Sequence, residues 1–280
     1  MDACLLKTVA LRGLEEDLIY GDKTTEALFP QPFLAVGRIL AKEDMVVAGL
    51  DISGIVFHLL DPGARFETAF PSGKTVKKGE VIQTLYADGR ALLKGERTAL
   101  NFLQRLSGIA TLTQRFVERV RGTSARIVDT RKTTPGLRAL EKEAVRLGGG
   151  GNHRFHLSDL ILIKDNHLAL SGGMALAIQR ARLQCSHPLK IEVEASNLKE
   201  VEEAMGCGVD MIMLDNMSIQ DIQCAVALIR SNTPKILIEV SGGIHMENVA
   251  EVARCGVDLI SVGALTHSAP AVDISFKITP

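Results

Sequence analysis

The sequence lacks the features of several protein classes. No apolar run approaches the roughly 18 residues that a membrane helix needs, and no low-complexity segment interrupts the chain. The formal net charge is only −1, so neither nucleic acid nor an anionic membrane is the expected partner. The five cysteines include no C-x-x-C pair, which argues against a structural zinc site and against a disulfide framework.

The N-terminal segment also lacks a targeting pattern. Acidic residues occupy positions 15–17, and no small-residue cleavage pattern follows a long apolar stretch, so no signal peptide is expected. Because the thiols are expected to be free, we expect a reducing cytoplasm. The 280 residues are 46% hydrophobic and 23% charged, which is typical of a folded globular protein with one or two domains.

From about residue 125 onward, apolar and β-branched runs alternate with helix-like stretches. The runs ARIVDT, DLILIKDN, LKIEVEA, DMIMLDN, KILIEVSGG and DLISVGAL lie at 125–130, 159–166, 189–195, 210–216, 235–243 and 258–265. Continuous apolar strands between amphipathic helices predict parallel βα units. Six such strands predict a (β/α) barrel in which either two strands are poorly marked or the barrel is incomplete. An open doubly wound sheet is the alternative, although no G-x-G-x-x-G follows the first strand.

Two of these units are near-copies of each other. GCGVDMIMLDN at 206–216 and RCGVDLISVGA at 254–264 both pass from a helix end through Cys-Gly-Val-Asp into a strand. Gly208 and Gly256 are therefore expected to follow the last helical turn in a left-handed conformation.

Residues 1–108 have a different pattern and are predicted to form a separate α+β domain. FLAVGRILAKE, MVVAGL and GEVIQTLYAD predict strands, whereas DISGIVFHLL and GERTALNFLQRLSG predict helices. The alternating tail, AVDISFKI, is expected to return to this domain at 271–280, which leaves 109–270 for the barrel. The predicted fold class is thus α/β, with an N-terminal α+β sandwich.

The carboxyl ends of the predicted barrel strands carry polar residues. In a (β/α) barrel the active site lies at this end of the strands. In strand order these residues are Asp129, Arg131 and Lys132; Lys164, Asp165, Asn166 and His167; Glu192 and Glu194; Asp215 and Asn216; Glu239, Ser241, Gly242 and Gly243; and Gly263. Solvation explains one charged end, but polar residues at five of six ends on one rim indicate a functional site.

The charges are also sorted along the chain. Residues 126–167 hold eight Lys/Arg and five Asp/Glu, whereas residues 191–215 hold seven Asp/Glu and one Lys. In barrel order, one side of the rim is therefore cationic and the next is anionic. This arrangement suits a doubly anionic substrate on one side and a metal ion or sugar hydroxyls on the other.

Three basic motifs each allow two interpretations. Arg131 and Lys132 either bind an anion or lie in a solvated turn. GGGGNHR at 148–154 is either a flexible loop or a backbone that passes close to a ligand and offers His153 and Arg154 as donors. Lys164 follows four apolar residues, so its stem is expected to be buried, and its alternative role is a simple ion pair with Asp165.

The acidic and glycine-rich motifs complete the predicted site. Glu192 and Glu194 alternate in a strand, so both point to one face and require cations there, although one salt bridge would satisfy one of them. SGGI at 241–244 and Gly263 at the end of the next strand offer backbone N–H groups to a phosphate, which is a recurring feature of the last barrel strands.

Together these motifs resemble the quinolinate phosphoribosyltransferase family. ERTALNFLQRLSGIAT, DTRKTTPGLR, GGGGNHR, LIKDNH, EVEASN, MLDN, EVSGGI and VGALTHSAPAVDISFKI occur in order from residue 96 to 278, and GDKTTEALFP near the N-terminus is also similar. The resemblance implies a type II phosphoribosyltransferase architecture, in which an N-terminal sandwich accompanies an incomplete barrel. It also implies a homodimer, or a higher oligomer, in which Arg97 is donated across the interface.

The resemblance further implies a reaction and a set of site residues. Phosphoribosyl passes from phosphoribosyl pyrophosphate to quinolinate with loss of CO₂, giving nicotinate mononucleotide and pyrophosphate for NAD biosynthesis. The implied catalytic residues are Lys132, Lys164, Glu194 and Asp215, of which Glu194 and Asp215 would hold Mg²⁺, and no organic cofactor is expected. The implied substrate-binding residues are Arg97, Thr130, Arg131, Lys132, His153, Arg154, Lys164, Glu194, Asp215, Ser241, Gly242, Gly243, Gly263 and Ala264.

Three other functions remain open at this point. A paralogous transferase could use a different pyridine or pyrimidine acid. A Schiff-base aldolase could use Lys164. A non-catalytic relative could sense the acid or the sugar phosphate, although a sensor needs no metal-binding carboxylates beside a leaving group.

Overall fold

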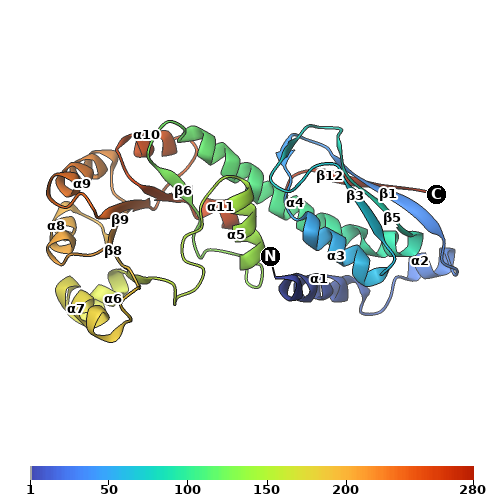
Figure 1. Ribbon diagram of the computed structural model, residues 1–280, viewed down its shortest axis with the longest axis horizontal. Helices are drawn as coiled ribbons and strands as arrows, with labels where there is room; N and C mark the ends of the chain where they lie inside the picture. Colours follow the sequence, from blue (N-terminus) through green and yellow to red (C-terminus); the bar gives the residue numbers. More distant parts are fainter. Residues whose placement is uncertain (1) are drawn as a thin grey trace. The chain divides into compact units, whose positions relative to one another are not determined.

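The computed structural model describes residues 2–280, which form two compact units (Figure 1). The N-terminal unit comprises residues 2–114, Thr133–Gly149 and Ser268–Pro280, and the barrel unit comprises Arg115–Lys132 and Gly150–His267. This division is not a single cut near residue 108, because helix α4 runs without a break from Gly89 to Arg119. Helix α5 (Arg138–Leu147) also packs with the N-terminal unit.

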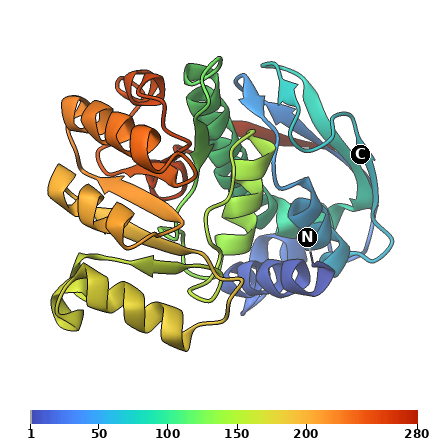
Figure 2. The same ribbon diagram turned by 60° about the vertical axis from the view of Figure 1, so that its left-hand side comes forward.

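The N-terminal unit is built on an antiparallel sheet. Its four strands lie in the order β12 (Ile274–Thr279), β1 (Leu34–Ala41), β5 (Val81–Asp88) and β3 (Arg65–Thr68). The C-terminal strand β12 therefore lies beside β1, although the two are far apart in the sequence (Figures 1 and 2). The unit also contains α1 (Ala3–Leu18), α2 (Lys23–Leu28), α3 (Leu50–Leu60) and a small ladder of β2 (Met45–Val46) with β4 (Thr75–Val76).

The barrel unit contains the six predicted parallel strands. Their order is β6 (Arg126–Val128), β11 (Leu259–Ser261), β10 (Leu237–Ser241), β9 (Met211–Asp215), β8 (Ile191–Ala195) and β7 (Ile161–Ile163). β6 and β7 are the two edges of this sheet, so the prediction of an incomplete barrel is confirmed.

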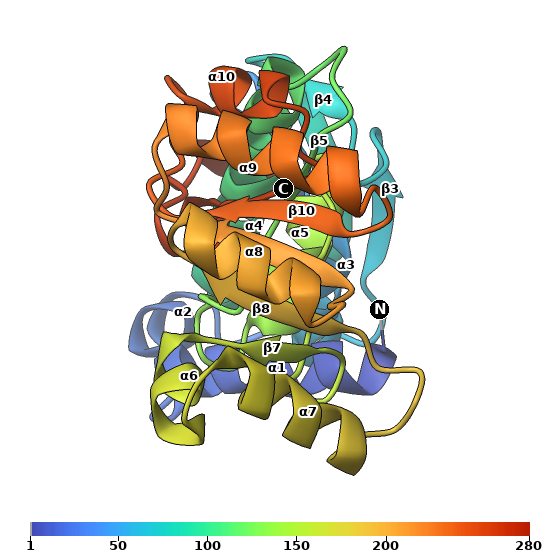
Figure 3. The same ribbon diagram turned by 90° about the vertical axis from the view of Figure 1, so that its left-hand side faces the viewer.

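The helices of the barrel unit follow the strands in sequence. They are α6 (Asp165–Ser171), α7 (Met174–Gln184), α8 (Leu198–Gly206), α9 (Ile219–Asn232), α10 (Val249–Arg254) and α11 (Ala264–His267). Figure 3 shows α7, α8 and α9 stacked over one face of the sheet. Because the strands are covered in this way, most of their residues are buried; in β9, for example, Met211 through Leu214 are all buried.

Local features of the structure also agree with the sequence predictions. Gly208 and Gly256 have φ angles of 66° and 87°, so the predicted left-handed glycines after the two near-identical helix ends are confirmed. All five cysteines are free thiols. Within residues 2–280, no helix combines the length and the apolar character needed to cross a membrane.

Candidate active site

A large cavity lies at the carboxyl ends of the barrel strands, within the barrel unit. Its volume is about 1000 Å³, which is enough for substrates of nucleotide size. The residues that the sequence predicted for the site and that line this cavity are Thr130, Arg131, Lys132, His153, Arg154, Lys164, Glu194, Asp215, Ser241, Gly242 and Gly243. The structure therefore brings together residues from the ends of β7, β8, β9 and β10, from the loop after β6 and from the loop before β7.

Three of the predicted residues do not line the cavity. Arg97 is exposed on α4, in the N-terminal unit. Gly263 and Ala264 follow β11, and Gly263 lies against Lys132, since a Cβ atom added to Gly263 would be 3.1 Å from the Lys132 Cδ atom.

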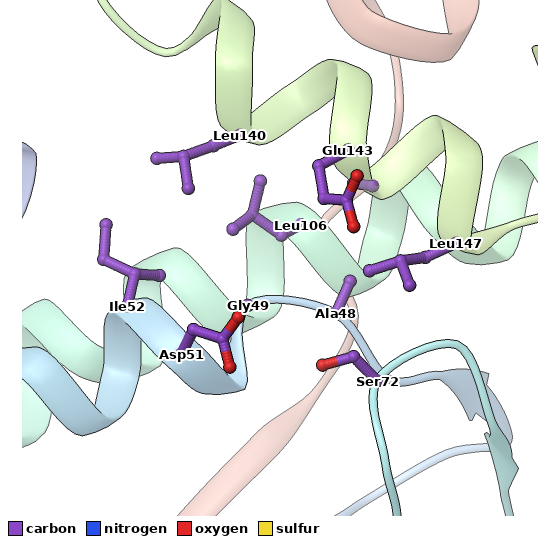
Figure 4. A pocket seen from close by; sticks show the side chains of 10 residues that line it. Ala48, Gly49, Asp51, Ile52, Ser72, Leu106, Leu140, Glu143 and Leu147 are labelled. Carbon is purple, nitrogen blue, oxygen red and sulfur yellow. The ribbon is translucent and has the colours of Figure 1, made fainter. Parts of the chain in front are cut away.

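A second cavity lies in the N-terminal unit and is much smaller. Figure 4 shows it between the start of α3, the side chain of Leu106 on α4, and Leu140, Glu143 and Leu147 on α5. Its volume is about 30 Å³, which holds little more than one water molecule. The larger cavity, in the barrel unit, is therefore the candidate substrate site.

The basic side of the large cavity holds two arginines close together. Arg154 is half-buried and donates from Nη1 to the Leu160 carbonyl at 3.2 Å. Burial lowers the pKa of the Arg154 guanidinium, and the positive charge of Arg131 lowers it further. Two guanidinium groups that repel each other at one cavity wall are stabilised by an anion that both can bind.

Lys164 forms an ion pair with Glu194, not with Asp165. The Nζ atom of Lys164 donates to the Oε1 atom of Glu194, and Asp165 instead accepts at 2.7 Å from the N–H of Asn166. The Glu194 side chain is only 13% exposed, whereas that of Lys164 is 44% exposed and faces the cavity. The alternative role of Lys164 as the partner of Asp165 is therefore wrong, and the ion pair joins the basic wall to the acidic wall.

The acidic and glycine-rich side is held by Asn216. Its Nδ2 atom donates to the Asp215 carboxylate at 2.8 Å, and its backbone N–H donates to the Ser241 carbonyl at 3.0 Å. Asn216 has a φ of 54°, a left-handed conformation that Asn tolerates better than most residues. It therefore connects the end of β9 with the glycine loop after β10.

Gly242 is the position in this loop where a side chain has no space. Its φ is 86°, and an added Cβ atom would lie 2.2 Å from the Oδ1 atom of Asn216. We expect Gly242→Ala to lower the free energy of unfolding by about 1–3 kcal/mol from backbone strain, with a further loss from this clash.

Thermal unfolding of Gly242→Ala measures this loss, and Gly122→Ala is the matched control. Gly122 also has a φ of 86°, but an added Cβ atom would have no neighbour within 4 Å, so this variant measures the backbone strain alone. Equal losses in the two variants would contradict the expected clash with Asn216.

A buried cluster forms part of the cavity wall, which His153 and Glu239 line. The Nε2 atom of His153 is 3.2 Å from the Oε2 atom of Glu192 and 3.3 Å from the Oε2 atom of Glu239. Both glutamates are 0% exposed. Burial by itself would lower the pKa of His153, but the two carboxylates outweigh this effect and raise the pKa to about 10, whereas burial raises the pKa of Glu192 to about 7.

The sequence pattern only partly anticipated this cluster. It predicted cationic partners for the side chains of Glu192 and Glu194, but it identified neither partner. The partner of Glu192 is His153 and the partner of Glu194 is Lys164, which come from two different loops. Glu239 was noted only as a strand end, and nothing in the local sequence indicated that its side chain is completely buried.

Two groups of carboxylates could hold a metal ion. Asp215 lines the open cavity together with Glu194, and oxygen donors with access to solvent suit Mg²⁺ and its waters. His153, Glu192 and Glu239 have ligand atoms within 4.8 Å of one another, but they are buried. The pair that lines the cavity, Asp215 and Glu194, is therefore the better candidate for a metal site.

Comparisons with known proteins agree with the fold. Family models for the quinolinate phosphoribosyl transferase N-terminal and C-terminal domains match residues 22–107 and 109–277. A relative from Synechocystis sp., described as a probable nicotinate-nucleotide pyrophosphorylase (carboxylating), is 44% identical over 265 residues, covering 95% of this chain and 90% of the relative. The nicotinate-nucleotide pyrophosphorylase (carboxylating) of Mycobacterium leprae is 42% identical, and the match covers 95% of each chain.

A solved structure gives the same result. The nicotinate-nucleotide pyrophosphorylase from Francisella tularensis superposes with a TM-score of 0.94 at 36% sequence identity, covering 100% of this chain and 98% of that chain. The motifs, the six-stranded incomplete barrel and the sequence matches over both domains lead to one conclusion: the chain belongs to the quinolinate phosphoribosyltransferase family.

Proposed function

We propose that the protein transfers phosphoribosyl from phosphoribosyl pyrophosphate to quinolinate, with loss of CO₂, and releases nicotinate mononucleotide and pyrophosphate. One observation carries this proposal beyond family membership. A single cavity combines a basic wall, an acidic pair and a glycine loop, which match a dicarboxylate, a metal-bound pyrophosphate and a 5-phosphate. The reaction is a step of NAD biosynthesis, and we propose the cytoplasm as its compartment.

The basic wall is the proposed quinolinate site. Arg131 and Arg154 would bind the carboxylates through charge-assisted hydrogen bonds, and Lys164 would complete the wall from the end of β7. Because these groups repel one another without a ligand, a dianion offsets more repulsion than a monoanion does. This argument favours quinolinate over nicotinate.

The opposite wall is the proposed site for the sugar donor. Ser241, Gly242 and Gly243 would bind the 5-phosphate through backbone N–H groups, and Lys132 would face the phosphates from the loop after β6. Asp215 and Glu194 would hold Mg²⁺ or the ribose hydroxyls. When bound, the magnesium ion would offset the charge that gathers on the departing pyrophosphate.

Positioning explains more of the proposed reaction than acid–base chemistry does. The two walls hold the quinolinate ring nitrogen against C1 of the ribose, so the nitrogen–carbon bond forms as the bond to pyrophosphate breaks. The alkylated ring is then cationic and accepts the electron pair left behind when the adjacent carboxylate departs as CO₂. A proton from solvent completes the ring, so no organic cofactor is required.

We also propose a homodimer in which Arg97 completes the basic wall of the partner subunit. Arg97 is exposed on α4, and Leu93, one turn earlier on the same helix, is 36% exposed. The same unit exposes further large apolar side chains, namely Ile19, Tyr20, Leu28, Phe29 and Leu34. Exposed large apolar side chains on the unit that also exposes Arg97 are typical of a protein–protein interface.

Mixed dimers test the shared site. Arg97→Gln and Arg131→Gln are each expected to be inactive alone, but unfolding and refolding them as an equal mixture should restore about a quarter of the wild-type activity. Half of the dimers would then be mixed, and each mixed dimer would contain one complete site. If Arg97 serves the site of its own chain, the mixture stays inactive.

The function is tested by following both products together. Purified protein is incubated with phosphoribosyl pyrophosphate, Mg²⁺ and quinolinate, and the mononucleotide and CO₂ are measured. Equal release of both, and none when nicotinate replaces quinolinate, supports the proposal. Turnover of another pyridine or pyrimidine acid would favour a paralogous transferase, and tight binding without turnover would favour a sensor.

A further inference from the structure

The buried cluster of His153, Glu192 and Glu239 has no part in the reaction as proposed so far. The three side chains come from the loop before β7 and from strands β8 and β10. The His153 side chain is 9% exposed and the two glutamate side chains are completely buried. Such a combination of two carboxylates and one imidazole requires a specific arrangement of hydrogens.

Only one hydrogen of His153 points toward the two carboxylates. The Nε2 atom forms a hydrogen bond with Glu192 at 3.2 Å. Within residues 2–280, the Oε1 atom of Glu192 and both carboxylate oxygens of Glu239 have no hydrogen-bond partner, although Glu239 lies 3.3 Å from Nε2. The imidazole is therefore held between two buried acceptors that compete for one donor.

The contact of Nδ1 decides whether Nε2 binds a metal ion or carries a hydrogen. Nδ1 of His153 accepts a hydrogen bond from the backbone N–H of Arg154 at 2.7 Å, so Nδ1 carries no hydrogen. A metal bound at Nε2 would leave the ring without a hydrogen on either nitrogen. The contacts thus assign the only ring hydrogen to Nε2 and exclude Nε2 as a metal ligand in this arrangement. The two glutamates raise the pKa of His153, so the cluster keeps a second proton at neutral pH. Because Nδ1 faces the N–H of Arg154, this second proton lies on a carboxylate and not on the ring, and burial favours this by raising the pKa of Glu192.

Both ring nitrogens of His153 are consequently used by the protein. Nε2 faces the glutamates and Nδ1 faces the backbone of Arg154. On the other side of the same segment, buried Asp129 accepts from the backbone N–H of His153 at 2.9 Å and from Asn152 at 2.7 Å. The segment that carries Arg154 is therefore held by carboxylates from both sides.

We infer that Glu192 and Glu239 are positioning residues for the quinolinate wall: they hold His153 as the Nε2–H tautomer, and His153 in turn fixes the backbone that aims Arg154 into the cavity. The inference rests on the proposed function in one respect, namely that Arg154 binds the dicarboxylate. It differs from the expectation that His153 itself donates a hydrogen bond to the substrate.

The tautomer can be measured without any substrate. The protein is labelled with ¹⁵N-histidine, and the resonances of His153 are assigned by comparison with His153→Asn. At neutral pH, we expect a hydrogen on Nε2 and none on Nδ1. A ring with hydrogens on both nitrogens, or on Nδ1 alone, overturns the inference, whether or not the protein turns over quinolinate.

Substitution of Glu192 separates a positioning role from a purely structural one. Glu192→Met removes the acceptor of the Nε2–H group, and we expect the KM for quinolinate to rise roughly tenfold while the KM for phosphoribosyl pyrophosphate changes less than about twofold. Glu192→Gln keeps an acceptor oxygen and should restore most of the affinity. Glu239→Gln should change the same KM by less, since no hydrogen bond joins Glu239 to His153.

The control variant removes a carboxylate elsewhere in the barrel unit. Asp258 forms an ion pair with Arg230 at 2.6 Å and does not line the cavity. Asp258→Asn should lower the melting temperature and leave both KM values unchanged. If Glu192→Met raises both KM values equally, or only lowers the melting temperature, the inference fails. If Glu192→Met does not fold, Glu192→Gln and the tautomer of the wild-type protein still decide.

Discussion

Replacement of Arg131 by glutamine is expected to raise the KM for quinolinate about 10²–10³-fold, or to abolish turnover, because a bidentate contact to a carboxylate contributes two charge-assisted hydrogen bonds. Glutamine keeps much of the length and some hydrogen-bonding capacity but loses the charge. Arg131 lines the cavity and is close enough to lower the pKa of Arg154. In Arg131→Gln, that repulsion disappears together with the contact to the substrate.

Steady-state kinetics with each substrate varied in turn measures this loss. The KM for phosphoribosyl pyrophosphate should change little, since Arg131 belongs to the quinolinate wall. Arg182→Gln is the matched control, because Arg182 lies in the same unit, donates to the Gly208 carbonyl and does not line the cavity. Wild-type kinetics for Arg131→Gln would remove Arg131 from the proposed site.

The barrel could be predicted from the sequence because its strands are buried on both faces. The sequence segments that form these strands, such as that of β9, are almost entirely apolar, and helical segments separate them clearly. The antiparallel sheet was harder to predict. β3 and β4 were not predicted, because Arg65–Thr68 has no fully buried residue and Thr75–Val76 is only two residues long. Pairing with β5 and β2 stabilises these strands, and such pairing is not visible locally.

The site could be predicted in outline for a different reason. In parallel strands, the carboxyl ends meet on one rim, so polar residues at strand ends converge whatever the details of packing. Pairings across the rim do not follow from this rule. The ion pair of Lys164 with Glu194 and the contact of His153 with Glu192 join residues 30 and 39 positions apart. Their partners depend on side-chain burial, which the sequence does not reveal.

The ion pair of Lys164 with Glu194 has a consequence for the acidic wall. One oxygen of Glu194 is already bound to the ammonium group, whereas the Asp215 carboxylate contacts only a neutral amide, that of Asn216, among the side-chain hydrogen bonds described. Asp215 is therefore the better placed of the two carboxylates to bind a cation or the ribose hydroxyls. The two residues should respond differently to removal of their charge.

Asp215→Asn is expected to lower kcat/KM for phosphoribosyl pyrophosphate about 10²-fold or more and to raise the Mg²⁺ concentration needed for half-maximal activity, because the amide is a weaker ligand for a hard cation. The KM for quinolinate should stay within about threefold of the wild-type value, since Asp215 does not contact the basic wall. Activity measured over a range of Mg²⁺ concentrations checks the first expectation.

Glu194→Gln provides the contrast that makes this test decisive. Loss of the Glu194 charge also leaves Lys164 without a counter-ion. The KM for quinolinate and the KM for phosphoribosyl pyrophosphate are therefore both expected to change, in contrast to Asp215→Asn. The two variants share a loss of one negative charge, so a general electrostatic effect of the acidic wall would change the same constants in both. We expect Asp215→Asn to affect only the constants for the sugar donor and Mg²⁺, and Glu194→Gln to affect the constants for both substrates. This difference would show that the ion pair of Lys164 with Glu194 links the basic wall to the acidic wall, whereas the same changes in both variants would contradict that link.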